Sequence, residues 1–147
     1  MKQRIYLDNC CFNRPYDDQA SPKIRFEAQA KLFIQGLVLG KEVELVWSYI
    51  LKFENSKNLF SAKKNAIAQW EALSVMFVDA SDEVVSLAES IVQTGVKVND
   101  ALHLACAITA GCSYCITVDN RMRKYRNDRI VICGPIEFLN YYFNYYE

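Results

Sequence analysis

Short apolar runs alternate along the chain with longer stretches in which apolar residues recur every three or four positions. Runs of the first kind, which are typical of buried strands, occupy residues 4–7, 43–47, 75–78, 114–118 and 130–133. Stretches of the second kind, which are typical of helices, occupy residues 24–39, 48–54, 60–73, 81–95 and 101–110, and a last helix begins at Pro135. This alternation predicts an α/β fold: a three-layer α/β/α sandwich around a central, mostly parallel sheet of four to five strands.

Three segments carry further signals of their place in this fold. The polar segment 12–22 contains two prolines and predicts a loop. Helix 101–110 is apolar nearly all round, so we expect it to be buried. Helix 24–39 carries apolar residues at helical spacing, such as Ile24, Ala28, Leu32 and Leu39.

The chain ends in an aromatic segment. We expect Phe138 and Leu139 to dock the last helix on the sheet, together with part of the set Tyr141, Tyr142, Phe143, Tyr145 and Tyr146. Aromatic side chains can instead stack on bases or form a dimer interface. We expect a homodimer, but we leave these residues out of the predicted site.

Composition narrows the class of protein. The length of 147 residues predicts one domain, residues 1–147, and 52% hydrophobic residues predict a globular chain. Lys plus Arg and Asp plus Glu both number 17, so only local patches of charge can recruit a nucleic acid. Neither a signal peptide nor a transmembrane run is evident, and we expect a cytoplasmic protein without a membrane partner.

The cysteines have two interpretations. Cys11, Cys106, Cys115 and Cys133 lie in apolar surroundings, and without a secretory signal we expect free, buried thiols. The alternative is a zinc or redox site, in which the C-x-x-C segment 112–115 would join Cys106 and Cys133. That segment has no second close pair and runs into a predicted strand.

Four carboxylates are placed where open α/β sheets form their sites. Asp8 and Asp119 each end a predicted strand, at the carboxyl edge of the sheet. Asp100 lies in the first turn of a helix, and Glu54 lies on the helix after the second strand. Each has a simpler interpretation: Asp100 can complement a helix dipole, Asp8 and Asp119 can end strands as turn residues, and most helical glutamates are solvated.

If these carboxylates converge, their repulsion requires protonation or a cation. Two like charges about 4 Å apart repel by roughly 4 kcal/mol at an effective dielectric of 20. Oxygen-only ligands favour Mg²⁺ or Mn²⁺, ions that support phosphodiester hydrolysis. We therefore expect Asp8, Asp100 and Asp119 to hold the metal and Glu54 to complete the catalytic set.

Basic residues follow the last of these acids. They are Arg121, Arg123, Lys124, Arg126 and Arg129, opposed only by Asp128. We expect Arg121, Arg123, Lys124 and also Arg14, which follows Asp8, to bind the phosphates of a nucleic-acid backbone; the alternative is a solvated turn. His103, the single histidine, shares a helix face with Asp100 and is expected to support the site or the fold rather than act as a base.

Three motifs together resemble the PIN-domain family. They are the strand running into Asp8 within residues 5–15, the segment NDALHLA at 99–105 and the segment ITVD at 116–119. The resemblance spans nearly the whole chain. It implies a PIN-like fold, Glu54 as the second acid, and Thr117 as a residue that supports the site. The family usually has Thr or Ser where this chain has Asn9, whose amide can still hydrogen-bond a ligand carboxylate.

The resemblance also implies a function. PIN-domain proteins are mostly metal-dependent ribonucleases, often VapC-like toxins paired with an antitoxin protein. The implied activity is a Mg²⁺- or Mn²⁺-dependent endoribonuclease acting on single-stranded RNA. The alternative is a catalytically silent PIN-like module that binds RNA or protein, against which the intact acidic set argues. A phospho-receiver or phosphatase domain fits less well. Those folds generally have a lysine at a later strand end, whereas the predicted fourth strand of this chain ends in Asp119.

Overall fold

The computed structural model describes residues 2–146, with side chains to residue 144. Across these residues one sheet has five strands, all parallel, in the order β3-β2-β1-β4-β5. The strands are β1 (Arg4–Leu7), β2 (Glu44–Ser48), β3 (Met76–Val78), β4 (Tyr114–Ile116) and β5 (Val131–Cys133). The predicted fold class is therefore confirmed, and each strand matches a predicted apolar run.

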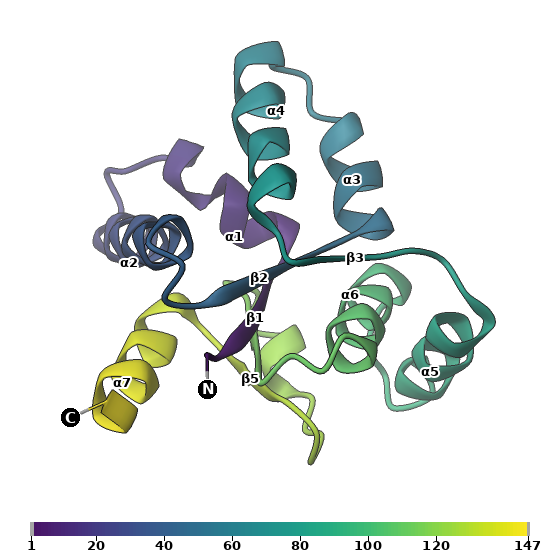
Figure 1. Cartoon of the computed structure of the whole chain (residues 1–147). Coiled ribbons are helices and arrows are strands. Elements are labelled where there is room, and N and C mark those ends of the chain that lie inside the picture. Colours follow the sequence, from purple (N-terminus) through teal and green to yellow (C-terminus); the bar gives the residue numbers. More distant parts are fainter. Residues whose placement is uncertain (1, 147) are drawn as a thin grey trace.

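Helices cover both faces of the sheet, with α3 and α4 above it and α5 and α6 below it in Figure 1. The α-helices are α1 (Asn9–Asn13), α2 (Pro22–Leu39), α3 (Tyr49–Ser56), α4 (Ser61–Ala68), α5 (Asp82–Val92), α6 (Val98–Thr109) and α7 (Pro135–Tyr146). Short 3₁₀ turns occupy η1 (Arg14–Tyr16), η2 (Gln69–Leu73) and η3 (Met122–Lys124). Helix α5 packs on α6, and α2 packs on α7.

The strand order places beside β1 the switch point at which open α/β sheets form a crevice. From β1 the chain moves to β2 and β3 on one side, and it then crosses over to β4 and β5 on the other. Ligands of open α/β sheets bind at such a switch point, outside the carboxyl ends of the strands. Asp8 directly follows β1 and Thr117 directly follows β4, so the topology alone brings these two residues to the crevice.

The predicted loop at 12–22 was partly wrong. Helix α1 and the turn η1 occupy residues 9–16, because Asp8 is the N-cap of α1 and its carboxylate accepts a hydrogen bond from the Cys11 backbone N–H, at 2.9 Å. The prediction for residues 60–73 also needs correction, since α4 ends at Ala68 and a 3₁₀ turn follows. Helix α6 begins at Val98, so Asp100 lies within its first turn.

Helix α2 is rotated so that only some of its helically spaced apolar residues face the core. Ala28 is 3% exposed, but Leu32 and Leu39 are 53% and 60% exposed, whereas Glu27, Lys31 and Gln35 are buried. The N-terminal segment accounts for this rotation by supplying partners for two of the polar side chains. Arg14 Nε lies 3.4 Å from Glu27 Oε1, and Lys31 Nζ lies 5.0 Å from the centroid of the Phe12 ring. Burial lowers the pKa of Lys31 to about 8.

Other predictions about the core are confirmed. The inner face of α6 is buried from Ala101 to Ile108, and Cys11, Cys106, Cys115 and Cys133 are buried free thiols. Phe138 is fully buried against the Tyr114 ring, 5.1 Å between centroids, and Leu139 packs on the core. The side chains of Tyr145 and Tyr146 lie outside the described residues. Within residues 2–146, no helix has both the length and the apolar character needed to cross a membrane.

The rotation of α2 predicts a contrast between two leucines on that helix. Leu37 is 7% exposed and Leu32 is 53% exposed. Leu37→Ala should lower the free energy of unfolding by about 2–5 kcal/mol because it leaves a cavity, whereas Leu32→Ala should change it by less than about 0.5 kcal/mol. Urea unfolding curves measure both values. Equal losses, or a larger loss for Leu32→Ala, would contradict the observed rotation.

Candidate active site

A hydrogen-bonded chain ties together the carboxyl ends of β1 and β4. Thr117 Oγ1 donates to Asp8 Oδ2 at 2.6 Å and accepts from the Asp119 backbone N–H at 3.0 Å. The other oxygen of Asp8 accepts from the Cys11 N–H in α1. Asp119 is held in turn, because its Oδ1 accepts from the Arg121 N–H at 2.9 Å. One threonine hydroxyl thereby sets the position of two of the predicted acids.

Asp8 is 2% exposed, and this burial is unusual for a carboxylate. Burial raises its pKa to about 6, and the charge of Asp100 contributes in the same direction. His103 and the hydrogen bonds from Thr117 and Cys11 act against this rise, but they do not cancel it. The site therefore holds a carboxylate whose charge is poorly compensated by the chain itself.

Asp100 and Asp119 are half-buried beside Asp8. Burial raises the pKa of Asp100, and the charges of Asp119 and Glu54 raise it further, while His103 and Lys97 lower it. The Cys10 thiol on α1 experiences all four carboxylates: burial and then the charges of Asp8, Asp119, Asp100 and Glu54 raise its pKa to about 12. The predicted acids thus share one electrostatic environment, and Cys10 is a neighbour that sequence reasoning did not single out.

The carboxylates do not form a ready-made metal cage. Among the described residues, no group of three or more His, Cys, Asp or Glu side chains is arranged to hold an ion. This statement includes the zinc alternative at Cys106, segment 112–115 and Cys133. The burial of these thiols and the raised pKa values of Cys106, Cys112 and Cys133, each about 12, are typical of core cysteines.

A chain of hydrogen-bonded side chains in the core connects Glu54 to strands β1 and β2. Glu54 Oε1 lies 2.5 Å from His103 Nε2, and His103 Nδ1 lies 2.5 Å from the Tyr6 hydroxyl. The Tyr6 hydroxyl lies 2.7 Å from Ser48 Oγ. His103, Tyr6 and Ser48 are each at most 2% exposed. His103 therefore contacts Glu54 directly, while Tyr6 and Ser48 are members of the site that the sequence did not reveal, because they resemble ordinary strand residues.

Asn9 has a different partner from the one the sequence suggested. Its side-chain oxygen accepts from Asn13 Nδ2 at 3.1 Å, one helical turn away, and the hydrogen bonds of Asp8 come instead from Thr117 and Cys11. Asn9 lines a shallow cleft of about 350 Å³ together with Glu54 and the cations Lys57 and Lys63. Asn9 therefore adjoins the site as one of the residues that line this cleft, next to Glu54.

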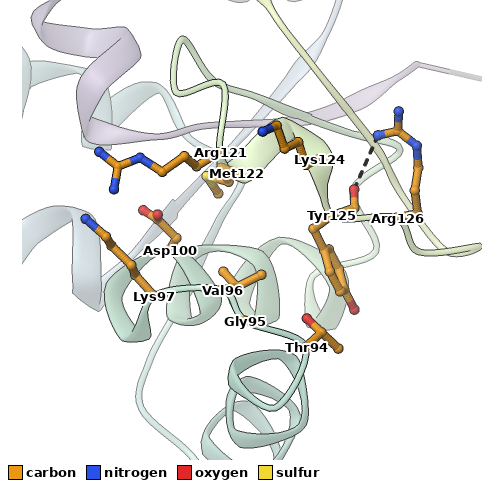
Figure 2. A pocket seen from close by; sticks show the side chains of 10 residues that line it. All are labelled: Thr94, Gly95, Val96, Lys97, Asp100, Arg121, Met122, Lys124, Tyr125 and Arg126. Carbon is orange, nitrogen blue, oxygen red and sulfur yellow. Dashed lines mark hydrogen bonds between the residues drawn. The ribbon is translucent and has the colours of Figure 1, made fainter.

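The predicted basic residues divide into two groups. Arg121 and Lys124 line a cleft of about 610 Å³ that also includes Asp100, with Lys97, Arg126 and Tyr125 on its walls. Figure 2 shows the charged ends of Lys97 and Arg121 on the same side of Asp100. Arg126 is anchored in this wall by a 2.6 Å hydrogen bond to the Arg123 carbonyl. We call the carboxylates of Asp8, Glu54, Asp100 and Asp119 the acidic rim. Asp100 belongs both to this rim and to the lining of the basic cleft, so the two regions meet there.

Arg123 and Arg14 are engaged elsewhere. Arg123 forms an ion pair with Glu137 at the start of α7 and donates to Asn120 Oδ1 at 3.3 Å. Arg14 Nη1 lies 3.1 Å from Asp17 Oδ2, and its Nε faces Glu27. These ion pairs give both guanidiniums partners inside the chain, and neither residue lines the cleft beside Asp100.

Comparisons with known proteins agree with this architecture. The crystal structure of VapBC2 from Rickettsia felis bound to a DNA fragment from their promoter matches with a TM-score of 0.54 at 16% sequence identity, over 88% of this chain and 97% of that chain. At this identity the likeness concerns the fold alone. A search of curated proteins found no match. The family model of the PIN domain matches residues 5–128, a range that includes all four acids and strands β1 to β4. The chain therefore belongs to the PIN domain family.

Proposed function

We propose that this chain is a Mg²⁺- or Mn²⁺-dependent endoribonuclease that hydrolyses phosphodiester bonds in single-stranded RNA. PIN domains are generally nucleases. The observation that carries the proposal is that four carboxylates lie close enough to act on the same thiol, Cys10, and that one of them, Asp100, also lines a cleft with cations on its walls. A strand of RNA has the complementary chemistry, because its phosphates need a metal at the reacting bond and cations along the flanking backbone.

The residues present fit a hydrated divalent ion. Their donors are carboxylate oxygens, the ligands that Mg²⁺ and Mn²⁺ prefer, and burial leaves the negative charge of Asp8 poorly compensated. Mg²⁺ usually keeps several waters and binds through one or two carboxylates plus substrate phosphates, so it does not need a cage of three side chains. Asp8, Asp100 and Asp119 would hold it. When bound, such an ion acidifies a water and stabilises charge on the phosphoryl and leaving oxygens.

The chain's own residues supply position and orientation. Thr117 fixes the Asp8 carboxylate and the Asp119 backbone, so both acids keep their geometry at the crevice. Arg121, Lys124 and Lys97 on the walls of the cleft can hold RNA phosphates next to Asp100. Tyr125 offers an aromatic ring on which an unpaired base can stack, which favours single-stranded RNA.

We also propose a biological setting. The matched structure contains VapBC2 bound to promoter DNA, and the family includes VapC-like toxins, so we infer that this chain is the toxin of a toxin–antitoxin pair. Its partners would be RNA, an antitoxin protein and a second copy of the chain, and it would act in the cytoplasm. A small adjacent gene for a DNA-binding protein with a disordered tail would support the pairing.

The catalytic prediction concerns the metal and its ligands. The purified protein should cleave single-stranded RNA with Mg²⁺ or Mn²⁺, leaving a 5′-phosphate and a 3′-hydroxyl without a cyclic phosphate, and EDTA should abolish cleavage. Asp8→Asn and Asp100→Asn should each lower the rate by more than about 100-fold, the upper end of the loss when a ligand's supporting partner is removed. Gel assays and end-group analysis provide the measurement.

Two outcomes would reject this activity. Cleavage that persists in EDTA or in Asp8→Asn would rule out the metal mechanism. A folded wild type that binds RNA and Mn²⁺ yet cleaves no RNA would favour the alternative of a catalytically silent binding module. Asp128→Asn, an exposed carboxylate outside the acidic rim, is the control and should cleave at the wild-type rate.

The cleft predicts a specific salt dependence. Replacing Arg121 and Lys124 together by Gln should weaken binding of a single-stranded RNA in EDTA and reduce the slope of log affinity against log salt by about 0.7 for each phosphate that is no longer neutralised. Fluorescence anisotropy across a salt series measures this slope. Arg123→Gln should have a smaller effect, because Arg123 is paired with Glu137.

The matched control for this experiment is Arg25→Gln with Lys2→Gln. It removes two exposed cations outside the cleft and changes the net charge by the same amount. If the cleft variant and this control have the same salt slope, the cleft residues do not contact the RNA backbone.

The burial of Asp8 predicts how stability depends on pH without metal. Its pKa rises from 3.8 to about 6 in the folded chain, so the folded state binds this proton more tightly than the unfolded state. The stabilisation that comes from this bound proton is complete below about pH 4. It is lost as the pH rises through about 6, which lowers the free energy of unfolding by about 3 kcal/mol. In EDTA at pH 7.5, Asp8→Asn should therefore be more stable than wild type, and thermal melts from pH 4 to 8 should show a flatter profile. Parallel pH profiles for the two proteins would contradict the raised pKa.

A further inference from the structure

The polar chain behind Glu54 crosses the sheet core without a break. It begins in β2 at Ser48, passes through Tyr6 of β1 and His103 of α6, and ends at Glu54 of α3. Every link is 2.7 Å or shorter between heavy atoms. Of the buried polar atoms without a hydrogen-bond partner among the described residues, none belongs to these four side chains. A buried polar network of this kind is stabilising only when all its members are satisfied.

The carboxylate at one end of the chain fixes the direction of the hydrogen bond that it accepts. A carboxylate has only acceptor oxygens, so the proton between Glu54 and His103 belongs to Nε2 of the ring. A ring with a lone pair on Nδ1 accepts the Tyr6 hydroxyl proton, and Tyr6 then accepts from Ser48; a ring with protons on both nitrogens donates to Tyr6, which then donates to Ser48. In both patterns the Ser48 oxygen accepts from the Leu51 N–H, at 3.2 Å.

We propose that Tyr6 is a positioning residue, which acts through His103 to hold the Glu54 carboxylate at the acidic rim. Tyr6 lies in the middle of β1, two residues before Asp8, so the strand that delivers the first acid also orients the second. Glu54 Oε1 is used by His103, whereas Oε2 has no hydrogen-bond partner among the described residues and remains for the site. The functional part of this inference rests on the proposed nuclease activity; the hydrogen-bond pattern does not.

The fact that His103 is the single histidine makes the pattern directly measurable. Protein labelled with ¹⁵N-histidine gives one imidazole spin system, which long-range ¹H–¹⁵N correlation spectra assign to a tautomer. In EDTA we expect a proton on Nε2, which donates to Glu54, and a hydrogen bond between Nδ1 and Tyr6. A ring whose only proton is on Nδ1 would overturn the proposal, because Nε2 could then not donate to Glu54.

Tyr6→Phe tests the link with a minimal change, since it removes one oxygen and keeps the buried ring. We expect the Nδ1 signal to shift, because this nitrogen loses its hydrogen-bond partner, and the Nε2 proton to exchange faster with water. Tyr142→Phe, which removes a hydroxyl on α7 that donates to Glu42, is the control and should leave both signals unchanged. Unchanged signals in Tyr6→Phe would also overturn the proposal.

The rate measurements separate positioning from a purely structural role. In Mn²⁺, Tyr6→Phe should lower kcat by about 10-fold, at the low end of the loss when a ligand's supporting partner is removed, with KM for RNA little changed because the cleft is untouched. His103→Gln retains an N–H donor toward Glu54 and should cleave within about 10-fold of wild type, whereas His103→Leu should lose about 10–100-fold.

The two readouts also distinguish the possible failures. Equal rates for His103→Gln and His103→Leu, or a Tyr6→Phe variant at the wild-type kcat, would refute the positioning role. If the wild type has no nuclease activity but shows the expected spectrum, the proposed function fails while the hydrogen-bond pattern stands.

Discussion

The hydrogen bond from Thr117 Oγ1 to Asp8 Oδ2, at 2.6 Å, joins the two strands that flank the switch point of the sheet. Parallel strands bring their carboxyl ends to one edge, but that edge is open between β1 and β4, where the crossover connections lead to opposite sides. Without a partner, a carboxylate as buried as that of Asp8 would be costly. The hydroxyl of Thr117 and the N–H of Cys11 provide the partners, and the same threonine oxygen orients the Asp119 backbone. The rest of the acidic rim is arranged around this fixed point.

The rim combines stabilised and uncompensated charge. Glu54 contacts His103, and Asp119 accepts from the Arg121 N–H. The pKa values of Asp8 and Asp100 are raised, because burial and neighbouring carboxylates outweigh the hydrogen bonds to Asp8 and the positive charges near Asp100. Cations are nearby, yet they line the adjoining cleft and do not neutralise Asp8. The fold thus places a negatively charged region next to a positively charged one, although the chain as a whole has zero formal net charge.

The N-terminal segment after Asp8 also reorganises helix α2. Arg14 and Phe12 provide partners for Glu27 and Lys31, so polar side chains of α2 turn inward and large apolar side chains such as Phe33 turn outward. The Phe33 ring packs edge-on against Phe143 of α7, with 5.7 Å between centroids, which connects the outer surface of α2 to the last helix. The position of α2 therefore depends on the segment that carries the first acid as well as on the buried apolar residues of the helix, such as Ile34 and Val38.

The sequence by itself determined the fold class, the limits of most elements and the position of Asp8 and Asp119 at the carboxyl edge of the sheet. Apolar runs of four or five residues and helical periodicity are local signals, and an acid that ends a parallel strand must lie at the carboxyl edge. Tertiary structure alone decided the rotation of α2, because the buried partners of Glu27 and Lys31 come from a segment that sequence patterns describe as a loop. It also decided which cations reach the cleft: Arg123 and Lys124 are adjacent in the chain, but Arg123 pairs with Glu137 whereas Lys124 lines the cleft beside Asp100. Tyr6, Ser48 and His103 come from distant segments, and only their packing in the core joins them into one hydrogen-bonded chain, because hydrogen bonds depend on distances that no local pattern encodes.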